Sequence, residues 1–299
     1  MIQCCTWFLA FLAISLQPPP KHWEAVAYNE STDELAVFSG AEFSHGKFYT
    51  TDSLWIFNQR WQYFDDNSIS GRWSHALVWH KNDLYTYGGL TLNSKGAEVL
   101  LNDLYTFRKT WKKIGEGPLL NRPSLFSDAE KLILAGQSNL DQNVFEVWEI
   151  SDNMFSKKMT IDIGFAPDGF ALMNTKNGIV LSNFSSDGLI IRNLSNGETQ
   201  EIKDQPKADK AAISYHPHQN CFFVFGGIKN NQVYSSDLYR IQDGHSKKIS
   251  TSGPSPRAGA HLLPATKDLI LYGGTNEKGM PTSEMWRLEN DLWKKIVYP

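Results

Sequence analysis

A glycine pair that recurs at the end of short apolar runs constrains this 299-residue chain more than any other feature. The clear copies "LYTYGG", "FFVFGG" and "LILYGG" end at Gly89, Gly227 and Gly274, and weaker copies are "LAVFSG", "LILAGQ" and "GIVLSN". Aligned on the first position of the pair, the copies stand at 39, 88, 135, 182, 226 and 273, with spacings of 49, 47, 47, 44 and 47 residues. A near-constant period of this length is typical of solenoids and propellers, in which each unit buries its faces against its neighbours.

Each period contains four short runs that suit β-strands. In the second unit they are "GRWSHALVW", "DLYTYGG", "NDLYTF" and "TWKKI", and the last unit repeats the plan with "GPSPRAGAHLL", "LILYGG", "SEMWRL" and "DLWKKI". The fourth unit is degraded, because it lacks both the glycine pair and the aromatic of the final run. Four short strands in sequence predict one small antiparallel sheet in each period.

An arginine before the first run, Gly-Gly after the second, an aromatic after "DL" in the third and Trp in the fourth together resemble the kelch repeat, over residues 21–299. The resemblance implies an all-β, six-bladed β-propeller with four antiparallel strands per blade. The blades would span about 21–66, 67–114, 115–160, 161–204, 205–250 and 251–299. The glycine pairs would lie where neighbouring blades leave no room for Cβ atoms. The fourth-strand aromatics would fill the outer gaps between blades; they are Trp61, Trp111, Phe155 and Trp293.

The first twenty residues differ from the rest of the chain. The run "TWFLAFLAISL" is apolar over eleven positions and no charge precedes Lys21. Its length suits a signal-peptide core better than a membrane span, so we expect residues 1–20 to be a cleaved signal and the protein to be secreted or extracytoplasmic. The alternatives are an N-terminal anchor, or a structural strand in a cytoplasmic protein. Cys221 would be the one cysteine left after cleavage, so no disulfide framework is expected.

Neither the composition nor the motifs predict a cofactor or a catalytic centre. A net charge of −3 gives no bias towards nucleic acid. Of the eight histidines, only "HPH" (216–218) forms a tight pair, and no third ligand follows at a metal-site spacing. The chain lacks both the G-x-S-x-G and the G-x-x-x-x-G-K-[ST] motifs. We therefore expect no metal site, and the sequence does not allow a catalytic residue to be named.

Two enzyme types resemble the predicted fold. Kelch galactose oxidases carry copper beside a crosslinked Tyr–Cys pair, whereas Cys221 lies in a second strand of this chain, which speaks against that chemistry. Bacterial sialic-acid epimerases are secreted six-bladed kelch proteins of similar size. The resemblance to them concerns the fold alone, and no catalytic residue maps onto this chain.

Four cations precede or open the first strand of their units, and they are the candidate ligand-binding residues together with Trp73. The cations are Arg72, Arg122, Lys210 and Arg257. If the blades are equivalent, these side chains would surround one end of the axis and attract a carboxylate sugar, a sulfated glycan or an acidic peptide, on which Trp73 could stack. The alternative is structural. Acids recur near the third strand at Asp52, Asp103, Glu146, Asp237 and Glu284, and periodic placement favours their pairing with the cations.

The longest connections between second and third strands are residues 41–52 and 90–101, in the first two blades. Loops of one class lie together on one face of a propeller and are frequent binding sites. We therefore predict a monomeric, non-catalytic interaction module that binds a protein or an acidic glycan on one loop face. The first alternative is a secreted carbohydrate-active enzyme, similar to sialic-acid epimerases or mutarotases, that uses the axial pocket. The second is a cytosolic kelch adaptor.

Overall fold

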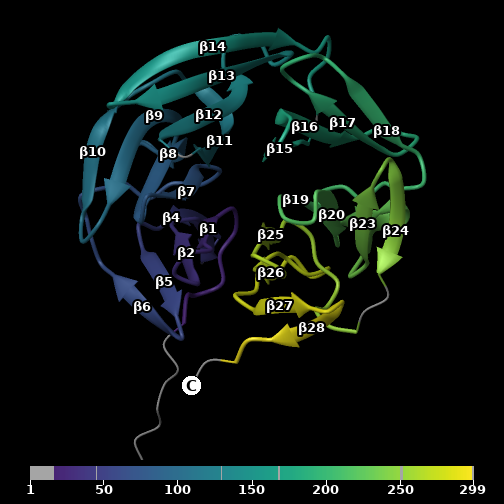
Figure 1. The fold of residues 1–299 in the computed structure, drawn as a ribbon. Coiled ribbons are helices and arrows are strands. Elements are labelled where there is room, and N and C mark those ends of the chain that lie inside the picture. The colour runs from purple at the N-terminus through teal and green to yellow at the C-terminus, as the bar shows by residue number, and fades with distance from the viewer. Residues whose placement is uncertain (1–16, 45, 129, 168, 250–251, 298–299) are drawn as a thin grey trace, which may run out of the picture.

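The computed structural model describes residues 17–299 except 45, 129, 168, 250–251 and 298–299. Six four-stranded antiparallel sheets surround a central axis (Figure 1), which confirms the predicted all-β, six-bladed propeller. Most of the expected signal segment, residues 1–16, lies outside the described residues.

The first three blades follow one another along the chain. Blade 1 consists of β1 (Ala25–Asn29), β2 (Glu34–Phe38), β5 (Leu54–Asn58) and β6 (Arg60–Phe64), and it carries the hairpin β3 (Ala41–Ser44) and β4 (Lys47–Thr50). Blade 2 consists of β7 (Ala76–His80), β8 (Asp83–Leu92), β9 (Glu98–Phe107) and β10 (Trp111–Glu116). Blade 3 consists of β11 (Leu120–Asp128), β12 (Lys131–Ser138), β13 (Val144–Ser151) and β14 (Met154–Asp162).

The other three blades complete the ring. Blade 4 consists of β15 (Ala171–Thr175), β16 (Gly178–Phe184), β17 (Leu189–Asn193) and β18 (Thr199–Ile202). Blade 5 consists of β19 (Ala212–His216), β20 (Cys221–Phe225), β23 (Leu238–Gln242) and β24 (His245–Ile249), with β21 (Ile228–Lys229), the 3₁₀ turn η1 (Asn230–Gln232) and β22 (Val233–Tyr234) inserted. Blade 6 consists of β25 (His261–Pro264), β26 (Leu269–Tyr272), β27 (Met285–Glu289) and β28 (Leu292–Lys295).

The glycine pairs lie where the chain is most crowded. A Cβ atom on Gly226 of blade 5 would come within 2.5 Å of the Arg257 carbonyl oxygen of blade 6. A Cβ atom on Gly89 would lie 2.6 Å from the Cβ of His75, in the segment that enters its own blade. Both glycines also have positive φ, at +70° and +90°. The first glycine of a pair thus faces the next blade and the second faces its own first strand, so larger residues are excluded sterically.

Aromatics of the fourth strands bridge neighbouring blades, as predicted. Trp111 of blade 2 packs against Phe38 of blade 1, with ring centroids 4.6 Å apart. Trp293 packs against Phe225 of blade 5 at 5.7 Å. Phe155 and Trp61 make the corresponding contacts, with Tyr87 and Tyr272.

The ring closes by side-chain packing. Each sheet comes from one continuous segment, with β1 innermost in blade 1 and β28 outermost in blade 6. Between these blades, Val37 and Trp61 share an apolar cluster with Ile270. At the edge of the seam, Arg287 donates a 2.7 Å hydrogen bond to Asp33. Burial of apolar surface therefore holds the first blade to the last.

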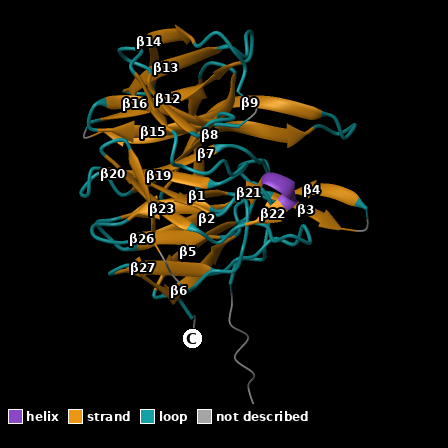
Figure 2. Cartoon of the chain, turned by 90° about the vertical axis from the view of Figure 1, so that its right-hand side faces the viewer, coloured by secondary structure: helices purple, strands orange, loops and turns teal. Residues whose placement is uncertain are grey.

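The two ends of the ring differ. One end carries the tight turns between first and second strands and between third and fourth strands, and we call it the turn face. The other end carries the connections between second and third strands, including the β3–β4 hairpin, the long β8–β9 hairpin and the β21–β22 insertion. We call it the hairpin face, and its hairpins project to the right in Figure 2.

Candidate functional site

Arg72 and Arg257 are buried in ion pairs with acids on the third strand of their own blades. The Arg72 side chain is 0% exposed, and its Nη1 and Nη2 donate to the two carboxylate oxygens of Asp103 at 2.6 and 3.2 Å. Nη1 also donates to the carbonyl oxygen of Gly88 at 3.1 Å. Arg257 is similar, but it donates one hydrogen bond to Glu284, at 2.6 Å, and one to the carbonyl oxygen of Gly273, the first glycine of its pair, at 3.1 Å. Each guanidinium ties the start of the first strand to the glycine pair and to the third strand.

The acids at the other repeat positions have different partners. Glu146 pairs with Lys157 at 3.0 Å, and Asp237 pairs with Lys248 at 2.7 Å, both on fourth strands. Burial by itself raises the pKa of Glu284, but hydrogen bonds from Arg257 and other donors hold this pKa at about 2. The predicted pairing of acids with first-strand cations is therefore present in blades 2 and 6. The acids of blades 3 and 5 pair with lysines of the outer strand, and Asp237 also pairs with Lys229 of the β21–β22 insertion.

Arg122 and Lys210 occupy a different position from Arg72 and Arg257. Both are exposed and have the left-handed conformation, with φ of +47° and +56°. Lys210 stands two residues before Ala212, the first paired residue of blade 5, whereas Arg122 lies within β11 at the bulge that precedes Ser124. Trp23 has the position of Lys210 in blade 1, with φ of +55°. The four predicted cations thus form two separate sets, one buried and one exposed near the inner ends of the first strands at the hairpin face.

The position of Arg72 is taken by Lys21 in blade 1. Each of these residues precedes a residue that forms an isolated β-bridge, His22 with Ala41 and Trp73 with Leu90. Lys21 is 5% exposed and its Nζ donates to Thr51 Oγ1 at 2.7 Å. Sequence comparison missed Lys21 because blade 1 has no arginine at this point.

Four titratable groups, three of them buried and His261 partly buried, lie at or just before the inner strands of blades 6, 1 and 2. Burial raises the pKa of Glu24 to about 7 and lowers the pKa of Lys21 to about 8. Burial also lowers the pKa of His261 to about 4 and holds that of His75 well below its usual value. A Cβ atom on Gly273 would lie 2.7 Å from Glu24 Oε1, so this carboxyl packs tightly against blade 6. Burial therefore shifts the titration of each group towards its neutral form.

Exposed apolar side chains gather on the hairpin face. Of the thirteen large hydrophobic residues that are exposed in the described part of the chain, nine lie in hairpins and connections at this face. They are Trp23, Phe43, Tyr49, Val99, Leu119, Leu140, Phe165, Val233 and Met280. Isolated apolar residues are common on protein surfaces, and in this protein most of them lie at one end of the ring.

Aromatic rings organise part of this face. Phe43 is 62% exposed on β3 and packs against Phe48 on β4, with ring centroids 5.1 Å apart. Phe48 in turn packs against Trp73 at 4.9 Å and against Trp23 at 6.1 Å. Trp73 is only 5% exposed, so this predicted ligand-stacking residue supports the β3–β4 hairpin from beneath. Trp23, which is 52% exposed, is the tryptophan that a partner could reach.

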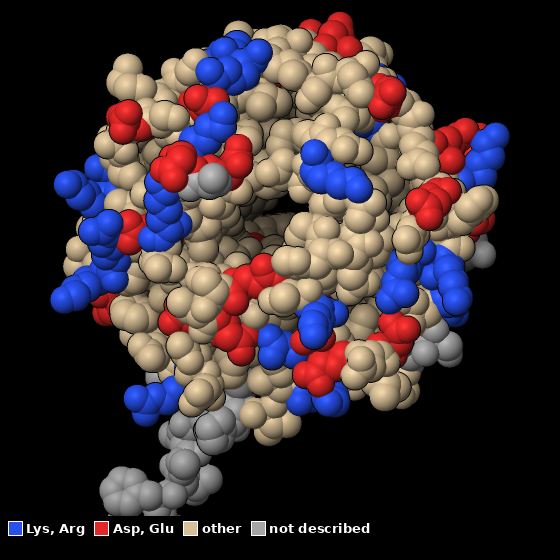
Figure 3. All heavy atoms as spheres, in the orientation of Figure 1, with Lys and Arg blue, Asp and Glu red and all other residues tan. Residues whose placement is uncertain are grey.

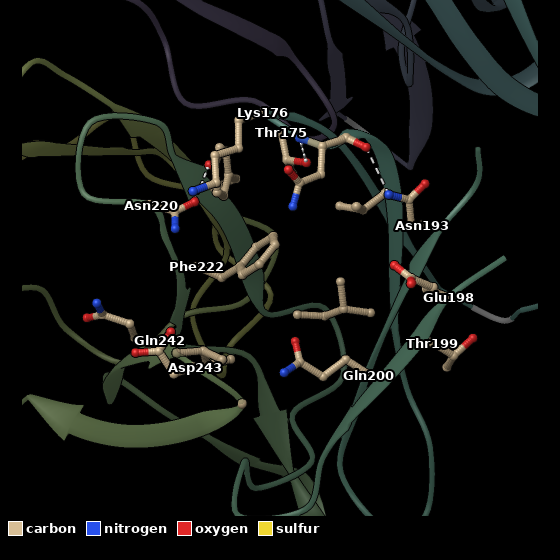
Figure 4. Close-up of a pocket in the computed structure, with 16 residues that line it drawn as sticks. Thr175, Lys176, Asn193, Glu198, Thr199, Gln200, Asn220, Phe222, Gln242 and Asp243 are labelled. Carbon is tan, nitrogen blue, oxygen red and sulfur yellow. Dashed lines mark hydrogen bonds between the residues drawn. The ribbon is translucent and has the colours of Figure 1, made fainter. Parts of the chain in front are cut away.

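The turn face has a different character. Figure 3 shows side chains of both charges spread over this face, around a central hollow. A cavity of about 680 Å³ opens here between blades 4 and 5, lined by residues of their turns and of the strands beneath. Figure 4 shows Phe222 in the middle of this cavity, with Gln200, Gln242 and Asp243 on one side and Thr175 and Lys176 on the other.

Neither a metal centre nor a membrane helix is found where the structure is described. Within those residues, no three His, Cys, Asp or Glu side chains are grouped as metal ligands would be. No helix in the same part of the chain is both long and apolar enough to cross a bilayer.

No family model matches this chain. Among solved structures, it is similar to YjhT, with a TM-score of 0.69 over 94% of this chain and 99% of YjhT. Only 12% of the aligned residues are identical, so the likeness supports the propeller fold and carries no residue-level information about activity.

Proposed function

We propose that this protein is a kelch-type propeller that acts as a non-catalytic interaction module, and that it binds a protein or an acidic glycan through the hairpin face. The observation that carries the proposal is the gathering of nine exposed large hydrophobic side chains at this one end of the ring. Exposed apolar surface of this kind is stabilised when a partner covers it. The projecting hairpins add contact area and shape, which favours a protein over a small molecule.

Charge on the same face indicates the chemistry of the partner. Arg122 and Lys210 are exposed near the axis, and the Arg122 guanidinium lies 5.7 Å from the centre of the Phe170 ring. Exposed arginine and lysine side chains attract carboxylate and sulfate groups. Acidic groups on the partner would therefore bind near the axis, while its apolar residues cover the hairpins.

The enzyme alternative would require a reactive group within a cavity. Glu24 has the raised pKa expected of a general acid or base, but it is 6% exposed and packs between blades. The 680 Å³ cavity lies between blades 4 and 5 and does not include Glu24. This separation supports the non-catalytic function.

The decisive test compares two pairs of exposed residues on opposite faces. The full chain is immobilised, and candidate partners and a glycan array are applied to wild type, to the hairpin-face variant Phe43→Ser/Val99→Ser and to the turn-face control Met154→Ser/Leu292→Ser. All four side chains are at least 38% exposed, so neither variant should unfold the protein. We expect binding to wild type and control and at least tenfold weaker binding to the hairpin-face variant. Equal binding to both variants would refute the proposal.

A second comparison separates protein from acidic glycan. Arg122→Ala/Lys210→Ala is expected to abolish binding of sulfated or carboxylated glycans and to make the remaining binding insensitive to salt. A protein partner would lose affinity in both double variants, because it contacts the hairpins as well as the cations.

We also propose export with cleavage near residue 20, on the apolar run of the N-terminal segment. N-terminal sequencing of protein recovered from the producing cells and from their medium tests this. A full-length intracellular protein would favour the cytosolic adaptor.

A further inference from the structure

The cavity between blades 4 and 5 lies on the turn face, so the proposed partner surface does not use it. Its volume of about 680 Å³ falls within the range of small-molecule sites. The two blades are joined beneath it by an apolar cluster that includes Val180, Ile191 and Ile241, and these three side chains also line the cavity. The cavity is therefore a depression whose base is formed by the packed side chains of the interface between blades 4 and 5.

A sequence difference in blade 5 accompanies this cavity. In blade 2, Trp111 pairs with Phe107 and reaches across to the preceding blade. The corresponding residue of blade 5 is Ser246, which pairs with Ile241. Serine cannot bridge the gap to blade 4, and its hydroxyl instead donates to Gln205 at 2.7 Å. The aromatic bridge that joins blades 1 and 2 is therefore absent between blades 4 and 5.

The base of the cavity is aromatic and apolar. Figure 4 shows the Phe222 ring in the middle of the site. Tyr215 lies beside it, with ring centroids 5.2 Å apart, and donates its hydroxyl to Asn220 Oδ1 at 2.8 Å. An aromatic ring at the base of an open cavity is suited to stacking against an apolar ligand face.

The walls are rich in side-chain amides. Gln200 and Gln242 extend from β18 and β23, and neither side chain has a hydrogen-bond partner among the described residues. Each amide offers a donor and an acceptor side by side. Charged groups are few and of mixed sign, with Lys176 opposed by Glu198 and Asp243. The cavity therefore has no excess of cations to hold a phosphate or a carboxylate.

We propose that this cavity binds a neutral saccharide. Adjacent ring hydroxyls require paired donors and acceptors, which the amides of Gln200 and Gln242 supply, and the C–H face of a pyranose ring would lie over Phe222. The mixed charge of the walls excludes an anionic sugar as the preferred ligand.

Saturation-transfer NMR on the full chain tests the proposal, with galactose, N-acetylglucosamine, lactose, maltose and cellobiose as probes and sialic acid as the anionic comparison. The variants Gln200→Ala/Gln242→Ala and Gln200→Trp remove the amides or fill the cavity. Gln200 and Gln242 are exposed, so folding should be unaffected. Matched controls are Gln62→Ala and Gln62→Trp, because Gln62 is an exposed residue on β6 of blade 1.

We expect at least one neutral sugar to bind wild type and both Gln62 variants. The amide double variant should bind this sugar about tenfold more weakly, and Gln200→Trp should not bind it. Absence of binding by every neutral sugar at millimolar concentration, preference for sialic acid, or binding that survives Gln200→Trp would each overturn the proposal. The hairpin-face variant Phe43→Ser/Val99→Ser should keep the sugar site, which makes this result independent of the proposed function.

Discussion

Replacing Arg72 with alanine is expected to destabilise the protein strongly and to leave partner binding unchanged. The guanidinium is fully buried, and its removal leaves the Asp103 carboxylate, which is 13% exposed, without the two hydrogen bonds that it now accepts. It also removes the donor to the Gly88 carbonyl oxygen and leaves a cavity. Removal of one partner from a buried ion pair costs about 3–5 kcal/mol of unfolding free energy. At about 2–4 °C per kcal/mol for a large domain, the melting temperature should fall by roughly 6–20 °C.

Urea unfolding followed by tryptophan fluorescence measures this loss, and Arg257→Ala supplies the comparison. The cost at Arg257 should be smaller, because the Glu284 side chain is 30% exposed and keeps a second partner in Lys295. A loss below about 1 kcal/mol at Arg72, or a larger loss at Arg257, would refute the argument from burial. If Arg72→Ala abolished ligand binding at unchanged stability, the residue would belong to a binding site after all.

Three further perturbations test the seam, the buried acid and the glycine pairs. Burial raises the pKa of Glu24 from 4.5 to about 7, so between these pH values the folded state binds a proton that the unfolded state does not. The bound proton stabilises the folded wild type, and this stabilisation is lost as the pH rises through the window. Glu24→Gln should therefore gain roughly 3 kcal/mol relative to wild type between about pH 4.5 and 7 in urea titrations, and a difference independent of pH would contradict this. Trp61→Ala at the closing seam should cost about 3–5 kcal/mol. Arg287→Ala should cost less than about 1 kcal/mol, because its 2.7 Å partner Asp33 is 66% exposed and its second partner Asp268 is 3.7 Å away. Similar losses in thermal melts would refute closure by packing. Gly89→Ala should prevent stable folding, because the added Cβ would lie 2.6 Å from the Cβ of His75. Gly96→Ala has open space around it and should cost only about 1 kcal/mol of backbone strain. Circular dichroism melts measure both effects.

Much of the architecture could be predicted because its signals are local and repeated. The run "LYTYGG" combines residues that favour strands with glycines that tolerate positive φ, and both properties act within a few residues. The fourth-strand tryptophans were also interpreted correctly, because a large apolar residue among exposed polar residues of an outer strand can bury itself only against the adjacent blade. Trp111 shows this pattern, with exposed lysines after it and Phe38 of blade 1 against its ring.

The candidate site was predicted less well, because spacing along the chain is not spacing in the fold. Lys210 and Arg72 both stand sixteen residues before the first glycine of their pairs. The turn between β19 and β20 has four residues, however, and the turn between β7 and β8 has two. This difference moves Lys210 to the exposed left-handed position and places Ala208 where Arg72 would be. In blade 3, a bulge between Asn121 and Ser124 displaces Arg122 in a similar way.

The sequence by itself determined the number of blades, the order of strands within each blade and the residues that pack between them. These features follow from periodic short-range patterns, and one period can be compared with the next. Only the tertiary structure decided which cations are buried, which apolar side chains share a face and where a cavity remains. Each of those depends on contacts between segments that are far apart in the sequence, and on the turn lengths that set which side chains meet. The pairing of Arg72 with Asp103 and the cavity above Phe222 are both results of that kind.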